Sequence, residues 1–326
     1  MKKIHEKSHS CIRSSRVHGV RRRRCTNCGK TWTVWKRKRG RKHSRPDKKL
    51  LKKIFVERQR LNQTAPVRLK QVSISGMSRR LARVMKAGLE LRAPRFSGTQ
   101  HVLLIDALWF RFRSQRCTLY LRALKRVGGH TARFLPPILL QGRESAAGWR
   151  TVIDEIPDRL KHRIVAMVSD GWRGVERAAQ KNHWILQRCH FHFIAQLQVN
   201  RGKRKKMRDQ AIREDIYQTA RILLTTKTNV RHCKNHLRRL IQRSDCPRRL
   251  RLIIREFLRR LSDFRAYLNH PDITLPITTN AMESKNKQIR QLCRPLRTPD
   301  SLLKWVSHFL KLNPEITCNG GKIPQN

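Results

Sequence analysis

The segment His101–Phe110 constrains the fold of this chain more than any other. Its sequence, HVLLIDALWF, is an apolar run that meets one acid, Asp106, and then stays apolar. Such a run predicts a strand buried on both faces. A carboxylate there loses its hydration, which is costly unless a cation or another partner compensates it. We therefore expect Asp106 either to pair with an arginine or to be a metal ligand on the central strand of a nuclease-like sheet.

The composition indicates a polyanionic partner. The 326 residues include 76 Lys and Arg against 21 Asp and Glu, which gives a formal net charge of +55. A compact body with this charge repels itself strongly unless a polyanion neutralises it. Because lysine and arginine replace the counterions condensed along DNA or RNA, nucleic acid is the expected partner. A purely structural nucleic-acid protein would share this composition, so the charge predicts binding and not catalysis.

Cysteine usage and hydropathy predict an intracellular location. The nine cysteines do not form the dense, even framework of a small secreted domain. The N-terminus does not resemble a signal peptide, and no run approaches the ~20 apolar residues of a membrane span. We expect a cytoplasmic, nucleoid-associated protein with reduced thiols and no membrane partner.

Residues 1–45 predict a small, basic, zinc-ribbon-like segment. Cys25-Thr26-Asn27-Cys28 is followed by glycine, and Cys11 precedes it at a ribbon-like distance. Thiolates at this spacing can hold Zn2+, which would order a segment that has too few apolar residues to fold alone. Tetrahedral zinc needs four ligands, and the fourth is either His9 or His18. The alternative is a degenerate knuckle without metal.

Residues 46–97 predict a DNA-binding region that resembles a helix-turn-helix. Three short apolar-periodic segments occur here, with a turn at Ser75-Gly76 before the last. In a helix-turn-helix the last helix enters the major groove. The exposed face of this helix would carry Arg79, Arg80, Arg83 and Lys86. The alternative is an ordinary basic helical linker.

Residues 98–203 predict the first part of a ribonuclease-H-like α/β core. Strands are expected at 101–112, 117–127, 131–141, 164–168 and 183–188, and helices at about 144–156 and 174–181. In that order the first and fourth strands are neighbours, so Asp106 and Asp170 converge. Asp170 lies where α/β sheets place their sites, although an acid there can also simply cap the next helix.

Two residue pairs next to this sheet carry weaker signals. Trp109 and Trp172 lie beside the two aspartates; we expect core packing for both, with stacking on bases as the alternative. Cys189 and His192 share one face of a helix at i, i+3. We expect a packed, hydrogen-bonding pair there and not a zinc site, because two ligands leave a zinc site incomplete.

The remaining chain predicts helices. Residues 204–270 form an all-α insertion, residues 271–314 the last helices of the core, and residues 315–326 a disordered tail. One helix face carries Glu283, Asn286, Lys287 and Arg290. Alone, Glu283 would form a surface ion pair with Lys287. With two aspartates already placed, Glu283 becomes the third carboxylate, and Lys287 and Arg290 become candidate phosphate contacts.

At Asp106, Ser169–Gly171, Cys189-x2-His192 and Thr278–Asn286 the chain resembles the Mutator-like (MULE-type) transposases of bacterial insertion sequences. The resemblance covers residues 100–312. It implies a ribonuclease-H-like catalytic domain with an α-helical insertion before the last acid. It also implies that Asp106, Asp170 and Glu283 form a DDE triad, and that Cys189 and His192 are the family's signature pair.

The resemblance therefore implies a DDE transposase that cleaves transposon ends and joins the 3′-OH to target DNA. Three carboxylates can hold two Mg2+ ions on one phosphate for this two-metal-ion transfer. The expected partners are end and target DNA and at least one further copy of the chain, since two ends must be brought together. The alternatives are a ribonuclease-H-like nuclease or resolvase that cuts without joining, and a non-catalytic basic DNA-binding protein.

Overall fold

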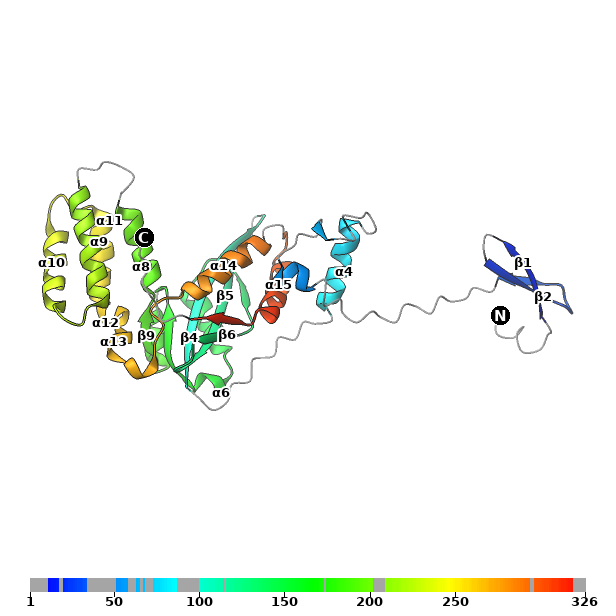
Figure 1. Cartoon of the computed structure of the whole chain (residues 1–326), viewed down its shortest axis with the longest axis horizontal. Coiled ribbons are helices and arrows are strands. Elements are labelled where there is room, and N and C mark those ends of the chain that lie inside the picture. Colours follow the sequence, from blue (N-terminus) through cyan, green and yellow to red (C-terminus); the bar gives the residue numbers. More distant parts are fainter. Residues whose placement is uncertain are drawn as a thin grey trace. The chain divides into compact units, whose positions relative to one another are not determined.

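The computed structural model describes residues 11–17, 20–33, 51–57, 63–64, 67, 73–86, 100–113, 115–172, 174–201, 209–293 and 296–318. The chain divides into two units, Met1–Lys48 and Lys49–Asn326. Figure 1 labels their elements, and the second unit contains the predicted acids. Within the described ranges no helix is long and apolar enough to cross a membrane.

The first unit contains a three-stranded antiparallel sheet in the order β1-β2-β3. Its strands are β1 (Cys11–Val17), β2 (Val20–Cys25) and β3 (Thr31–Thr33). A tight turn joins β2 to β3: the N–H of Gly29 donates to the carbonyl of Cys25, and that of Cys25 to the carbonyl of Lys30. Gly29 has φ +68°, a value that favours glycine.

The second unit is built on a mixed sheet in the order β10-β6-β5-β4-β8-β9, with β7 paired to β5. Its strands are β4 (His101–Phe112), β5 (Gln115–Arg126), β6 (Thr131–Phe134), β7 (Ile138–Gln141), β8 (Ile164–Ser169), β9 (Ile185–Arg188) and β10 (Glu315–Thr317). Neighbours β4, β5 and β6 are antiparallel, whereas β4–β8 and β8–β9 are parallel. With helices on both faces, the unit has an α/β fold.

Two expectations about strands need correction. The single strand expected at 131–141 is divided into β6 and β7, because Pro136 and Pro137 between them lack the N–H that a ladder needs. The tail expected to be disordered from residue 315 begins with a strand, since β10 pairs with β6 and the N–H of Cys318 donates to the carbonyl of His130. Residues 319–326 lie outside the described residues.

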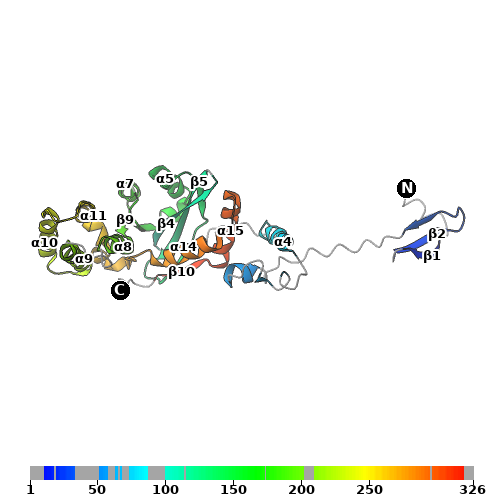
Figure 2. The ribbon, with the colours of Figure 1, turned by 90° about the horizontal axis from the view of Figure 1, so that it is seen from above.

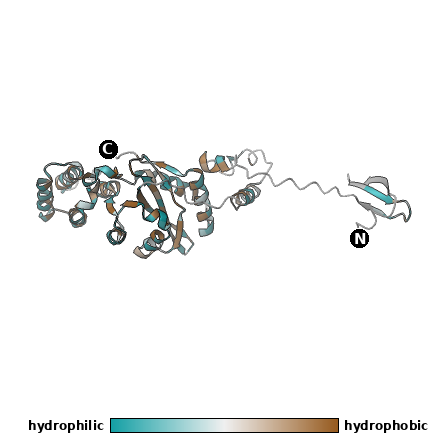
Figure 3. Ribbon diagram, turned by 90° about the horizontal axis from the view of Figure 1, so that it is seen from below, coloured by the Kyte–Doolittle hydropathy of each residue, from teal (hydrophilic) through white to brown (hydrophobic). Residues whose placement is uncertain are grey.

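Helices cover both faces of this sheet (Figure 2). One face carries α5 (Ala146–Asp154), α6 (Asp158–Lys161) and α7 (Val175–Lys181), and the other carries α14 (Asn280–Cys293) and α15 (Pro299–Leu312). The alternation along β4 explains both cores: Leu103 and Ile105 face the first group, whereas Leu104 and Leu108 face the second. Figure 3 shows the hydrophobic residues, in brown, running through the strands.

The predicted helix-turn-helix region is only partly described, and the turn expected at Ser75-Gly76 is wrong, because both residues lie inside a helix that begins at Ile74. Helix η1 (Lys52–Val56) and helix α4 (Ile74–Lys86) pack against α15, and the ring of His308 hydrogen-bonds the carbonyl of Met85 at 2.7 Å. The helix expected at 66–72 lies almost entirely outside the described residues. Arg79 and Arg83 are exposed and Arg80 is half-buried, while the side chain of Lys86 is not described.

The segment expected to be an all-α insertion is helical and has its own core. It contains α9 (Gln210–Thr225), α10 (Val230–Gln242), α11 (Arg248–Arg259), α12 (Leu261–Phe264), α13 (Ala266–Asn269) and η3 (Pro271–Ile273), and α8 (His190–Arg201) packs with it. Buried Gln187 ties it to β9, because its amide donates to the carbonyl of Phe264 and accepts from the N–H of Tyr267.

Gly148 provides a test of the packing between α5 and the sheet. A Cβ at Gly148 would lie 2.2 Å from the hydroxyl oxygen of buried Tyr120. We expect Gly148→Ala to lower the free energy of unfolding by about 1–3 kcal/mol, the usual cost of overpacking a core. Ala147→Ser, at an exposed position of α5, is the matched control and should change it by less than about 0.5 kcal/mol. Urea denaturation measures both, and equal stability of the two variants would contradict this packing.

Candidate active site

Asp106 and Asp170 come together where β4 and β8 end their pairing. The parallel ladder runs to Leu104 opposite Val168. Asp106 lies two residues beyond Leu104, and Asp170 two residues beyond Val168, so both aspartates lie at the same edge. Asp106 is 4% exposed. The convergence expected from the strand order is therefore present in the structure.

Neutral donors hold the Asp106 carboxylate. The amide of Asn286, on α14, donates to Oδ2 of Asp106 at 2.7 Å, and the N–H of Ala107 donates to Oδ1 at 2.8 Å. Asn286 is 2% exposed, and its own Oδ1 is buried without a hydrogen-bond partner among the described residues. An acceptor is thus left open beside a buried carboxylate.

Burial first, and then the nearby charges of Glu283 and Asp170, raise the pKa of Asp106 to about 8, against the opposing effects of His192 and the Ala107 N–H. Glu283 shares a hydrogen bond with Asp106 and has a lowered pKa. Two carboxyl groups in hydrogen-bond contact cannot both ionise easily, so without a cation one proton is shared and resides on Asp106.

His192 holds Glu283. The ring Nε2 of His192, on α8, lies 3.0 Å from Oε1 of Glu283, on α14. This hydrogen bond is the largest cause of the lowered pKa of Glu283. Burial disfavours the charged ring, but hydrogen bonds to Cys189 and Glu283 outweigh it and raise the pKa of His192 well above its ordinary value. His192 is therefore an imidazolium at neutral pH, and Glu283 pairs with it and not with Lys287.

Cys189, just before α8, makes a second contact to the start of α14, about one helical turn before the contact between His192 and Glu283. It is 1% exposed and follows β9, and its N–H donates to the carbonyl of Ser169. Both the N–H and the hydroxyl of Thr279 donate to its sulfur, at 3.2 and 3.3 Å. Thr279 precedes α14, on which Glu283 lies one turn further on. Cys189 and His192 thus each fix the start of the helix that carries Glu283, through separate hydrogen bonds to Thr279 and to Glu283.

Gly171 allows the chain to turn directly after Asp170. Its φ is +95°, and a Cβ there would lie 1.8 Å from Nη2 of Arg188. That same Nη2 donates to the carbonyl of Gly171 at 3.3 Å. The hydroxyl of Ser169 donates to Oδ1 of Asp170 at 3.4 Å. Only glycine leaves room for the guanidinium that braces this loop.

Sequence reasoning missed a fourth acid and misjudged one tryptophan. Glu144, before α5, accepts from the indole N–H of Trp149 at 2.7 Å, and burial together with the charge of Asp170 raises its pKa. Only a contact map could have placed it near Asp170. Trp172 is buried, as expected, but Trp109 is 70% exposed, so its predicted core packing is wrong. Trp109 lies beyond the last position at which β8 covers β4.

The other predicted residues lie around this cluster. Lys287 and Arg290 are exposed on α14, and the charge of Arg290 helps to lower the pKa of Glu283. In the first unit Cys25 is buried and Cys28 exposed, whereas His9, His18 and the side chain of Cys11 lie outside what is described.

The donors suit a hard cation, because three carboxylates and the open Asn286 oxygen are the oxygen ligands that Mg2+ prefers. Within the described residues, however, no three Asp, Glu, His or Cys side chains stand close enough to hold one ion by themselves. One of the three carboxylates, Glu283, is instead paired with His192.

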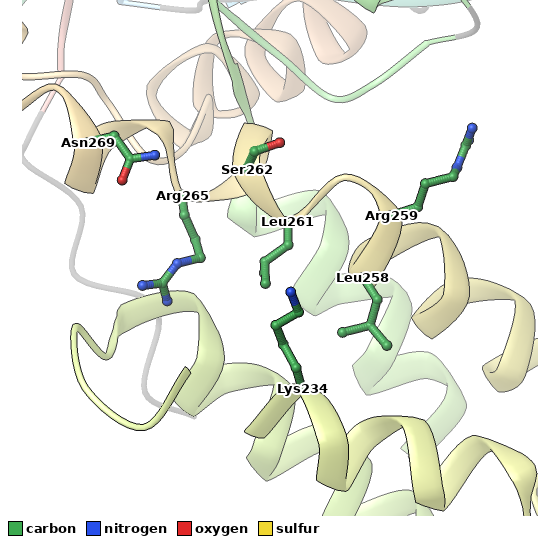
Figure 4. Close-up of a pocket in the computed structure, with 7 residues that line it drawn as sticks. All are labelled: Lys234, Leu258, Arg259, Leu261, Ser262, Arg265 and Asn269. Carbon is green, nitrogen blue, oxygen red and sulfur yellow. The ribbon is translucent and has the colours of Figure 1, made fainter. Parts of the chain in front are cut away.

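A basic hollow lies in the helical insertion. Its volume is about 320 Å³, and it is lined by Lys234, Leu258, Arg259, Leu261, Ser262, Arg265 and Asn269. Figure 4 shows the Lys234 side chain reaching from α10 towards the two leucines. Three of the lining residues are cations; Arg259 pairs with Glu256 and Arg265 donates to the carbonyl of Leu223.

An acidic cluster at the edge of an α/β sheet, inside a chain of charge +55, is the arrangement of an enzyme that acts on nucleic acid. The family model described as "Transposase, Mutator family" matches residues 66–306. The chain therefore belongs to the Mutator family of transposases, DNA-binding enzymes that cut and transfer DNA. No curated protein matches the chain.

Because the pKa of Asp106 is raised, replacing this residue by a neutral one should stabilise the folded chain, by an amount that depends on pH. Its folded pKa of about 8 lies above the unfolded value of 3.8. Its contribution therefore favours folding below about pH 4 and is lost as the pH rises through 8. In EDTA at pH 8, Asp106→Asn should be more stable than the original chain by up to about 5 kcal/mol, since the pKa shift spans about four units and each unit is worth about 1.4 kcal/mol. This difference should vanish near pH 4.

Thermal unfolding between pH 4 and 9 measures this. Asp272→Asn, which neutralises an exposed carboxylate, is the matched control and should follow the original chain at every pH. Parallel curves for the original chain and Asp106→Asn would contradict the raised pKa.

Proposed function

We propose that this chain is a DDE transposase, with Asp106, Asp170 and Glu283 as the triad of a ribonuclease-H-like core. One observation carries the proposal: two acids far away in the sequence, Asp170 and Glu283, lie close enough to the buried carboxyl group of Asp106 for their charges to raise its pKa. The sheet order also supports it, since three consecutive antiparallel strands lead into two parallel strands joined through helices.

The triad would hold two Mg2+ ions, with the open oxygen of Asn286 beside them. Bound Mg2+ supplies Lewis acidity, which lowers the pKa of a water and neutralises the charge on a leaving 3′ oxygen. The side chains of the chain do the positioning. Asn286 orients Asp106, His192 holds Glu283, and Cys189 anchors the start of α14 through Thr279.

The attacking group would be water in end cleavage and the released 3′-OH in joining. Both reactions replace one oxygen on phosphorus by another, so a single site serves both and no side chain needs to become covalently attached to DNA. Exposed Lys287 and Arg290 on α14, Arg79 and Arg83 on α4, and the hollow around Lys234 would contact phosphates. We further propose that at least two copies act together, because two transposon ends must be held at once, and that the enzyme works on the nucleoid in the cytoplasm.

We also propose that the first unit binds Zn2+ through Cys11, Cys25 and Cys28. The sheet register sets Cys11 directly opposite Cys25, and Cys28 lies in the turn that follows. The fourth ligand is His9 or His18. The metal would hold together a unit whose strands are mostly arginine, serine and threonine.

Separate neutralisation of the triad tests the enzyme proposal. Asp106→Asn, Asp170→Asn and Glu283→Gln should each reduce cleavage and joining of end DNA at least about 100-fold. DNA affinity should remain within about threefold. Mg2+ should raise the melting temperature of the original chain in the presence of DNA and lose this effect in each variant, since a ligand stabilises only the state that binds it. The control is Asp300→Asn, at an exposed position on α15.

A variant that keeps near-normal cleavage removes its residue from the triad. Supplying pre-cut ends with a target plasmid separates the alternatives: a nuclease or resolvase yields no joined product, and a non-catalytic DNA-binding protein yields no Mg2+-dependent product at all.

Zinc content tests the second proposal. The purified chain should contain about one Zn2+ per molecule by mass spectrometry of its metals, and Cys28→Ser should lower this occupancy at least about tenfold under mild chelation. Cys246→Ser, which changes a buried cysteine of the helical insertion, is the control and should leave it unchanged. A zinc-free protein with normal end binding would refute the site.

A further inference from the structure

The far end of the β4–β5 hairpin presents an exposed aromatic ring among arginines. Strand β8 pairs with β4 only as far as Leu104, and β7 pairs with β5 only over Cys117–Tyr120. Positions 109–112 of β4 therefore have β5 as their ladder partner. The residues that we call the hairpin surface are Trp109, Arg111, Arg113 and Arg116.

The alternation along β4 turns Trp109 outward. Leu108 and Phe112 point into the core that contains α14 and α15. Trp109 and Arg111 point to the other face, and the Trp109 side chain is 70% exposed. Tryptophan is strongly buried on average, and its flat ring is enriched where proteins meet partners. Its exposure therefore favours a partner that covers this face.

The charges next to Trp109 indicate that this partner is an anion. Arg111 lies directly opposite Arg116 in the ladder. Like charges at directly opposed positions destabilise a strand pair. Arg113, with φ +52°, adds a third cation at the turn. Among the described residues none of these three arginines has an ion pair, so an anion from outside would relieve their repulsion.

We propose that the hairpin surface binds a DNA strand beside the cleavage site, with Trp109 stacked on an unpaired base and the arginines on flanking phosphates. Stacking on an aromatic side chain tolerates any base, which suits a contact that does not read sequence. Three residues along a strand place Trp109 about 10 Å from Asp106. Because Trp109 points to the opposite face, it meets a nucleotide that flanks the reacting phosphate. The inference rests on the proposed function, since Asp106 defines where that phosphate lies.

Binding of the full chain to two DNAs in EDTA tests the stacking contact without cleavage. One DNA is a blunt duplex, and the other is the same duplex with a short unpaired 3′ extension that carries 2-aminopurine at its first unpaired position. Trp109→Ala should weaken binding to the extended DNA about tenfold, which is about 1.4 kcal/mol. It should leave the blunt duplex within twofold and abolish the quenching of 2-aminopurine. Trp109→Phe should keep most of the affinity.

The arginines are tested through salt dependence. Arg116→Gln should lower the slope of log affinity against log salt by about one, because one phosphate contact is lost. Arg126→Gln is the matched control: it removes the same charge from an exposed position at the other end of β5 and should leave the slope unchanged.

Several results would overturn the inference. One is original affinity of Trp109→Ala for both DNAs, and another is an equal loss in Leu252→Ala, which removes an exposed hydrophobic side chain on α11. A third is a changed oligomeric state of Trp109→Ala with unchanged DNA affinity, which would make the hairpin surface an interface between copies. If Asp106→Asn still cleaves DNA, the proposed function fails while these binding differences stand. If Asp106→Asn is inactive and the differences are absent, only this inference fails.

Discussion

The desolvation of Asp106 is the constraint on which the rest of the site depends. A carboxylate in the middle of a sheet needs a compensating charge, and a chain with 76 lysines and arginines could easily provide one. Within the described residues, however, the hydrogen bonds donated to Asp106 come from an amide and a backbone N–H, both neutral. The other close groups include two further acids, which raise its pKa. Such a site holds a proton when no cation is present and is poorly suited to a structural salt bridge.

Helix α14 brings distant acids together because contacts at two positions, one helical turn apart, fix it next to the sheet. Thr279, just before the helix, donates two hydrogen bonds to Cys189, and one turn later Glu283 meets His192. Both partners follow β9 directly, and β9 is the neighbour of the strand that ends at Asp170. The position of Glu283 relative to the sheet is thus determined by a thiol and an imidazolium. This gives a physical reason for a Cys-x2-His pair that need not bind metal.

Much of this arrangement follows from local sequence. The apolar run around Asp106 and the glycine after Asp170 predict buried strands and a turn, and the structure has β4 and β8 with a left-handed Gly171. The edge at which the two aspartates meet followed from the expected strand order. Properties that depend on where a neighbouring strand stops could not be predicted. Trp109 lies beyond the residues of β4 that pair with β8, and Glu144 comes near Asp170 from the residues just before α5, neither of which any periodicity encodes.

The charge of the chain bears on the metal binding that the proposed function requires. A body of charge +55 repels free Mg2+, so its local acids must first overcome this potential. Mg2+ in phosphate-transferring enzymes is commonly held by one or two carboxylates together with oxygens of the substrate. Under the proposed function DNA therefore supplies two things at once: it neutralises the surrounding arginines, and its phosphate completes the coordination. Binding of metal and of DNA would then be coupled, and the proton shared by Asp106 and Glu283 would be released only when both are present.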